Sequence, residues 1–267
     1  PSIRIHSGLY LERDALLWGE NYTQSLEPQV QYLFVKDVEQ QDIFGSYDTT
    51  LLQTDYYGLF RDKRYSSVDR IAAANQFTVG ASTRFFDEDF VERFNLSFGQ
   101  IFYLNDAGRN LTEDSESTPN YSATAFESDF NYDDWLFFHG GLQYDASKQE
   151  MQLANAAMEY REDDLFSQLN YRYVSKEYIE QSLPDNDQID NYTEDGISQL
   201  GFSAGFPVYG GLSLRGDYYH DLTENQMLEG QITLNYRSAC WMISLGYNEY
   251  LMSRSNVNTQ PAEYEQN

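Results

Sequence analysis

One stretch of the chain brings a carboxylate and an imidazole close enough in sequence for general acid–base chemistry, because Asp217, His220 and Asp221 fall within five consecutive residues. In an extended strand, successive side chains point to opposite faces. His220 then shares a face with Leu214 and Tyr218, whereas Asp217 points the other way. The pair does not converge, and the sequence predicts no enzyme.

Candidate metal ligands are scattered along the chain. His6 and His139 are isolated, and no zinc-ligand spacing joins the histidines to the single cysteine. The segment Asp185-Asn-Asp-Gln-Ile-Asp190 matches a calcium loop only over its first three residues, because Ile189 occupies a ligand position. The sequence therefore predicts no metal and no cofactor.

A mixed-charge cluster stands out in a chain that is otherwise poor in basic residues. Its members are Arg61, Asp62, Lys63, Arg64, Asp69 and Arg70. Such a cluster forms either a charge-paired lid or a site for phosphate groups, which guanidinium groups bind in a bidentate manner. We favour the lid.

The formal net charge of -26 excludes nucleic acid as a partner, because phosphate binding needs clustered lysine and arginine. Acidic residues gather in stretches such as 37–42, 113–116 and 185–195, which indicates solvated loops. No segment approaches the ~18 consecutive apolar residues of a transmembrane helix. Membrane-spanning strands need only ~10 residues each, with apolar side chains at alternate positions.

Period-two alternation recurs about a dozen times and decides the fold class. In one example, Leu26, Val30 and Phe34 alternate with polar residues; in another, Leu96 and Phe98 alternate with Asn95 and Ser97. The expected strands are 2–14, 22–36, 72–86, 90–104, 120–132, 135–146, 150–161, 164–175, 196–206, 210–221, 225–237 and 239–251. This pattern predicts an all-β, antiparallel transmembrane β-barrel segment forming a single domain over residues 1–267.

Connection lengths favour a membrane barrel over a soluble sandwich. The connections 37–71, 105–119 and 176–195 are long and polar, although 147–149 and 222–224 on the same side are short. Connections on the other side are tight turns, as at 87–89, 162–163 and 207–209. Outer-membrane barrels have this parity. We expect no strand in the tail 253–267, and further strands outside the chain.

Cys240 is the single cysteine, so it has no partner within the chain. In an exported protein, an unpaired cysteine indicates either a partner cysteine elsewhere or a buried, inert thiol. Both alternatives stay open on these grounds.

Several long motifs resemble the LptD family of lipopolysaccharide-assembly proteins. The most specific is residues 47–76, YDTTLLQTDYYGLFRDKRYSSVDRIAAANQ. Supporting motifs are NYTQSLEPQVQYL at 21–33, VERFNLSFGQIFY at 91–103, QLNYRY at 168–173 and GISQ at 196–199. The resemblance weakens only in the acidic loops and in the tail.

The resemblance implies the middle-to-late part of a 26-stranded outer-membrane barrel from a Gram-negative bacterium, without the periplasmic jelly-roll domain and the terminal strands. It implies lipopolysaccharide as substrate, the lipoprotein LptE as plug, periplasmic Lpt bridge proteins that act through the N-terminal domain, and the barrel-assembly machinery during folding. The loop that carries Arg61 to Arg70 would tuck into the barrel and face the plug. Cys240 would pair with a cysteine of the N-terminal region, and Ala239 replaces the adjacent cysteine of many relatives.

The expected function is therefore non-enzymatic transport of lipopolysaccharide into the outer leaflet, with a diffusion porin as the alternative. Polar side chains on the lumen side would contact the plug or the passing sugar. The candidates are Glu27, Gln29, Gln31, Arg84, Arg93 and Asn95.

Overall fold

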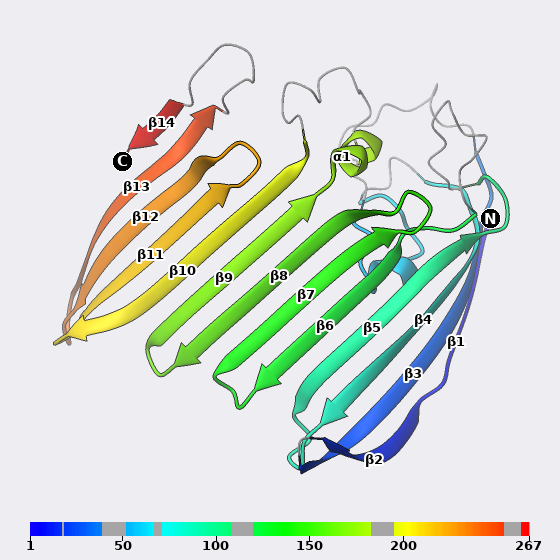
Figure 1. Cartoon of the computed structure of the whole chain (residues 1–267), viewed down its shortest axis with the longest axis horizontal. Helices are drawn as coiled ribbons and strands as arrows, with labels where there is room; N and C mark the ends of the chain where they lie inside the picture. Colours follow the sequence, from blue (N-terminus) through cyan, green and yellow to red (C-terminus); the bar gives the residue numbers. More distant parts are fainter. Residues whose placement is uncertain are drawn as a thin grey trace. The chain divides into compact units, whose positions relative to one another are not determined.

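The computed structural model describes residues 1–17, 19–38, 52–66, 71–107, 120–182, 195–253 and 263–266 (Figure 1). The chain divides into two compact units. The first comprises Pro1–Asp129 and Gly141–Gln152, and the second comprises Phe130–Gly140 and Leu153–Asn267. The single domain that the sequence suggests stays a prediction.

The first unit is built on antiparallel strands: β1 (Ser2–Gly8), β2 (Leu11–Leu17), β3 (Glu20–Val35), β4 (Ala74–Phe86) and β5 (Glu92–Tyr103). β3 pairs with β4, and β4 pairs with β5. β6 (Thr124–Tyr132), β7 (Leu136–Asp145) and β8 (Glu150–Glu162) contribute residues to both units.

The expected strand 2–14 is wrong in one respect, because it is two strands, β1 and β2, that pair with the same edge of β3. The break falls at Leu9, next to Gly8, which pairs with Gln29. Leu9 N–H donates to the carbonyl of Pro28 at 3.0 Å. Proline has no N–H to complete the ladder at this point, so the regular pairing is interrupted here.

The second unit continues the antiparallel order. Its further strands are β9 (Leu165–Val174), β10 (Ile197–Tyr209), β11 (Leu212–Asp221), β12 (Gln226–Arg237), β13 (Met242–Ser253) and β14 (Glu263–Gln266). From β8 to β14, each strand pairs with the next one along the chain. The predicted all-β, antiparallel fold class is confirmed.

Two local expectations, for the tail and for the turn at 207–209, are wrong, and one connection contains a helix. The tail contains β14, which pairs with β13. The connection 176–195 begins with a helix, α1 (Lys176–Ser182), whose first turn is capped by Ser175 Oγ accepting the N–H of Tyr178 at 3.2 Å. Residues 207–209 belong to β10, and the turn lies at Gly210 and Gly211, which both have positive φ. No helix among the described residues is long and apolar enough to cross a membrane.

The connections 147–149 and 222–224 are short, and an aspartate side chain stabilises each turn in the same way. Asp145 Oδ1 accepts the N–H of Ser147 at 2.9 Å, and Asp221 Oδ1 accepts the N–H of Thr223 at 3.0 Å. Side-chain acceptors of this kind stabilise tight turns. The residue before each following strand, Gln149 or Asn225, has positive φ.

The strands of the first unit have two faces of opposite character. One face, called here the apolar face, exposes Leu26, Val30, Phe77, Val79, Leu96 and Phe98, each between 40% and 50% exposed. The alternate residues form the polar face, and they include the buried side chains of Ser25, Gln31, Thr78, Ser82, Asn95 and Ser97. The alternation therefore holds, but it is the polar face that is covered.

In the second unit, the side chains of Gln168, Asn170 and Arg172 alternate along β9 with Leu169 and Tyr171, and Gln168 lies opposite Ser203 of β10. Leu169 and Phe202 are 42% and 47% exposed, whereas Ser203 is buried. The polar face of this unit carries Gln168, Asn170, Arg172, Ser203 and the residues in register with them.

Candidate functional site

Residues 52–66, called here the inserted segment, lie on the polar face of the first unit. A single 3-10 turn, Gly58–Phe60, brings Leu59 and Phe60 down onto the strands. Tyr56, Leu59 and Phe60 are at most 7% exposed and pack with Ile101 and Ala125. The buried apolar core of this unit thus lies between the inserted segment and the strands.

Two glycines make room for these side chains. Gly80 of β4 pairs with Gly99 of β5. A Cβ at Gly80 would lie 2.9 Å from Phe60 Cζ and 3.0 Å from Tyr56 Cε2, and a Cβ at Gly99 would lie 2.9 Å from Leu59 Cδ1. Such distances are too short for real side chains. The glycine pair therefore provides the space into which the inserted segment packs.

The hydroxyl of Tyr56 joins the inserted segment to three strands through hydrogen bonds. It accepts from Gln29 Nε2 at 2.7 Å and from Ser82 Oγ at 2.9 Å. Ser97 Oγ in turn donates to Ser82 Oγ at 2.9 Å. Buried polar groups need such partners, because each one left unsatisfied costs about 1–3 kcal/mol.

The backbone of the inserted segment is fixed as well. Thr78 Oγ1 donates to the carbonyl of Leu59 at 3.2 Å, and Arg4 Nη2 donates to the carbonyl of Phe60 at 3.1 Å. Tyr56 N–H donates to Glu127 Oε1 of β6 at 3.1 Å. The segment is thus tied to strands β1, β3, β4 and β6.

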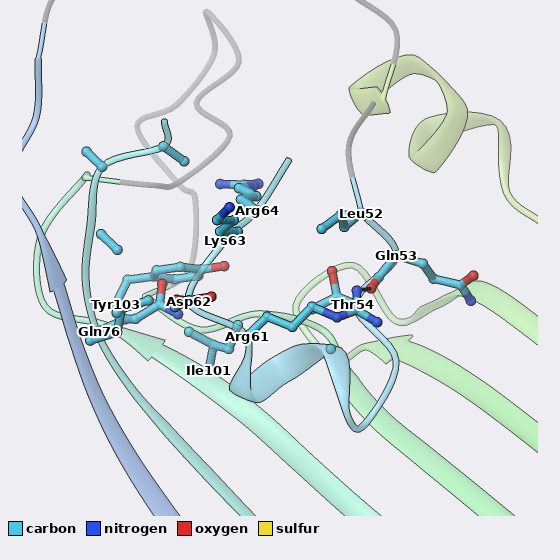
Figure 2. A pocket seen from close by; sticks show the side chains of 15 residues that line it. Leu52, Gln53, Thr54, Arg61, Asp62, Lys63, Arg64, Gln76, Ile101 and Tyr103 are labelled. Atoms are coloured by element: carbon cyan, nitrogen blue, oxygen red, sulfur yellow. Dashed lines mark hydrogen bonds between the residues drawn. The ribbon is translucent and has the colours of Figure 1, made fainter. Parts of the chain in front are cut away.

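The described part of the charged cluster surrounds a small cavity of about 80 Å³ at the edge of the inserted segment, as Figure 2 shows. Arg61, Asp62, Lys63 and Arg64 all line it. Arg61 Nη1 donates to the carbonyl of Gln53 at 2.9 Å, and its Nη2 lies 3.4 Å from Asp55 Oδ1. Arg61 is thus engaged within the segment. The predicted residues Asp69 and Arg70 lie outside the described residues.

The six candidate lumen residues all lie on the polar face, in two groups. Gln29, Gln31 and Asn95 lie under or beside the inserted segment: Gln31 Oε1 accepts from Arg4 Nε at 2.7 Å, and Asn95 Oδ1 lies 3.0 Å from Ser97 Oγ. Their role toward a plug or a sugar stays a prediction.

The second group, Glu27, Arg84 and Arg93, is only partly buried and is held by ion pairs near the β4–β5 turn. Arg84 Nε lies 3.6 Å from Glu27 Oε1, and Arg93 Nε lies 2.6 Å from Asp87 Oδ2. Burial raises the pKa of Asp87, but the N–H groups of Val91 and Asp89 and the Arg93 guanidinium outweigh it and lower the pKa.

Cys240 lies in the turn between β12 and β13, where Ser238 N–H donates to the carbonyl of Trp241 at 2.8 Å. Its thiol is free and exposed, so the alternative of a buried, inert thiol is wrong. The predicted pairing with a cysteine outside the chain stays a prediction.

The acid–base candidates do not meet. Asp217 binds Arg215, with Oδ2 accepting from Nε at 3.2 Å, and Asp221 caps its turn. His220 contacts Tyr218 and Asn225 through its two ring nitrogens at 3.2 and 3.3 Å. Among the described residues, no group of three or more His, Cys, Asp or Glu side chains is placed to hold a metal ion.

The residues that anchor the inserted segment are Tyr56, Leu59 and Phe60. They were not predicted, because the charged residues beside them are the more conspicuous feature of the sequence. The available signal was the pair Gly80 and Gly99, which interrupts the row of polar side chains on two neighbouring strands. Glycine inside a strand often marks a close approach by another part of the chain.

Comparison with known proteins identifies the chain. The family model of LptD, described as LPS transport system D, matches residues 1–210. LPS-assembly protein LptD of Photobacterium profundum is 56% identical over 275 residues, which cover 100% of this chain and 34% of that protein. The proteins of the same name from Vibrio vulnificus and Vibrio cholerae are 53% and 49% identical, over 96% and 98% of this chain and 32% and 34% of their own lengths. The chain belongs to the LptD family of outer-membrane lipopolysaccharide-assembly proteins and spans about a third of the length of these relatives.

Proposed function

We propose that the protein containing this chain is a non-enzymatic translocon that inserts lipopolysaccharide into the outer leaflet of the outer membrane. One observation carries the proposal: in a chain that matches the LptD family model, the strands have a polar face and an exposed apolar face. A hydrated lumen suits the sugar, and an apolar outer face suits lipid acyl chains. Nothing in the described residues or in the comparisons favours a diffusion porin.

We assign the polar face to the lumen and the inserted segment to the plug, LptE. Gln29 and Asn95 already have partners beneath or beside the inserted segment. In this arrangement the plug contacts the inserted segment, with its charged residues Asp62 and Lys63, more than the strands behind it. Glu27, Arg84 and Arg93, which are partly exposed, remain available to the plug or to the sugar.

The remaining partners follow from the same proposal. Periplasmic Lpt bridge proteins would deliver lipopolysaccharide through an N-terminal domain, and the barrel-assembly machinery would fold the strands. We also propose that Cys240 forms a disulfide with a cysteine of that N-terminal domain. Its exposure in a short turn supports this, because an exposed thiol is accessible to a partner.

The test is depletion of the full-length protein in its own bacterium, with labelled lipopolysaccharide followed to the cell surface. Surface delivery should stop on depletion and return on expression of the wild-type protein. Continued delivery without the protein contradicts the proposal.

Planar-bilayer conductance distinguishes the proposed translocon from a diffusion porin. A porin conducts steadily alone, whereas a plugged translocon conducts little until LptE is removed.

A further inference from the structure

A second hollow, of about 660 Å³, lies in the second unit at the end of strands β9 to β12 where the short turns close. Phe166, Pro207, Ser213, Arg215, Asn235 and Arg237 are among the residues that line it. We call it the arginine hollow. It is much larger than the cavity beside the inserted segment, and two guanidinium groups reach it.

Arg215 is held in a fixed orientation with part of its guanidinium free. It lies over the ring of Phe166, 5.3 Å from the ring centroid. The ring itself covers Gly205, where a Cβ would lie 2.4 Å from Phe166 Cε1. Backbone, ring and guanidinium thus form a stack, and such a cation–π contact orients the charged group.

Asp217 occupies only one side of this guanidinium. It accepts from Nε at 3.2 Å and from Nη2 at 3.4 Å. Within the described residues, Nη1 has no hydrogen-bond partner, although the guanidinium carries five N–H donors. The Arg215 side chain is 57% exposed, so the free donors are accessible.

Arg237 supplies a second cation from the neighbouring strand. Its backbone N–H donates to the carbonyl of Gly211 at 2.8 Å, which fixes the residue at the turn. Its side chain has no partner within the part of the chain that the structure describes. Arg215 pairs with Thr233, four residues before Arg237 on β12, so the two positions are about 13 Å apart along the strand.

From these contacts we propose that the arginine hollow binds the phosphate groups of the lipopolysaccharide headgroup. This rests on the proposed function and specifies where the charged headgroup touches the chain. Arginine donors bind such anions through charge-assisted, often bidentate hydrogen bonds. Phe166 and Pro207 supply apolar surface beside the cations.

The test uses the full-length protein with its lipoprotein partner in liposomes. In one sample, Ser213, which lines the hollow, is replaced by the photoreactive residue p-benzoylphenylalanine. In a second sample, the same residue replaces Asn170, on the polar face of β9. Each sample receives lipopolysaccharide, or lipopolysaccharide stripped of its phosphates by a phosphatase. The variants are Arg215→Gln with Arg237→Gln, and Arg172→Gln as the matched control. Arg172 lies on the polar face of β9, six residues or about 20 Å from Phe166.

We expect a lipopolysaccharide adduct at position 213 that falls at least about tenfold in the double variant, because two charge-assisted contacts are lost. The adduct should also fall with phosphate-free lipid and stay unchanged in the Arg172→Gln variant. Equal adducts with phosphate-free lipid, or an equal loss in Arg172→Gln, overturn the inference. A protein adduct at position 213 overturns it in favour of a protein partner. Lipid adducts at position 170 alone reject the hollow as the binding site but leave the proposed transport function standing. If neither position gives a lipid adduct and surface delivery also fails, the proposed function itself is rejected.

Discussion

Gly80 and Gly99 lie directly opposite each other on β4 and β5, and the side chains of the inserted segment fill the space that their missing side chains leave. The pair is flanked by polar residues such as Thr78 and Ser97 on the same face. An apolar contact in the middle of a polar face therefore depends on two positions without a Cβ.

Gly80→Val should displace the inserted segment, because the new side chain would occupy the space of Phe60 and Tyr56. Overpacking of this kind costs about 1–3 kcal/mol. Limited proteolysis of the folded protein in detergent should then cut within residues 52–66. Gly216→Val is the matched control, because its nearest neighbour would be 3.7 Å away. Equal protease resistance of Gly80→Val and wild type contradicts the packing described here.

Tyr56→Phe keeps the ring but removes the hydroxyl that accepts from Gln29 and Ser82. We expect a loss of about 1–3 kcal/mol, since the buried Ser82 hydroxyl and the half-buried Gln29 amide lose their acceptor. Denaturant unfolding in detergent measures the change. Tyr209→Phe, at a side chain that is 87% exposed, should leave stability unchanged.

Asp87→Asn should reduce stability near neutral pH but not in acid. The folded-state pKa of Asp87 lies below its ordinary value, which is about 3.9 in an unfolded chain. The carboxylate therefore contributes stability above that unfolded pKa, and the contribution is lost as pH falls through the lower, folded pKa. The unfolding midpoints of wild type and variant should differ at pH 7 and converge at acid pH. A difference that persists unchanged in acid would assign the effect to something other than the charge.

The two glycines of the β10–β11 turn should differ in their tolerance of alanine. Both have positive φ, which costs an alanine about 1–2 kcal/mol. Gly211 also lies against the carbonyl of Arg237, 2.3 Å from the position of an added Cβ, whereas nothing lies within 4 Å at Gly210. Gly211→Ala should therefore lower the unfolding midpoint more than Gly210→Ala, and the reverse order would contradict this geometry.

Cys240→Ser should change the mobility of the full-length protein in non-reducing electrophoresis, because it removes the proposed disulfide to the N-terminal domain. Reducing conditions should abolish the difference between wild type and variant. Ser238→Ala, in the same turn, is the control and should leave the mobility as it is. Identical mobilities of wild type and Cys240→Ser without reductant would eliminate the disulfide.

The alternation of side chains was enough to predict most strands, because a half-buried strand repeats every two residues and each strand here is long enough to show it. β14 was missed because Glu263–Gln266 is four residues long and rich in charge. α1 was missed although Ser175 precedes it, a residue type that commonly begins helices.

The candidate site was predicted only in part. Charged residues such as Arg61 are conspicuous in an acidic chain, whereas Tyr56 and Phe60 look like ordinary aromatic residues in a loop. Their burial depends on Gly80 and Gly99, which lie in strands that follow the loop in sequence. A contact across such a separation leaves no periodic signal, so only the spatial pairing of β4 with β5 reveals it.

The packing of the inserted segment against several strands also has a consequence for the order of folding. Its contacts reach from Arg4 on β1 to Glu127 on β6, so they exist only once these strands have come together. A slip of one residue in the alignment of a strand turns all its side chains over, which would send Gly80 or Gly99 to the opposite side. Docking of this segment is therefore a late event that only a correctly aligned set of strands can complete.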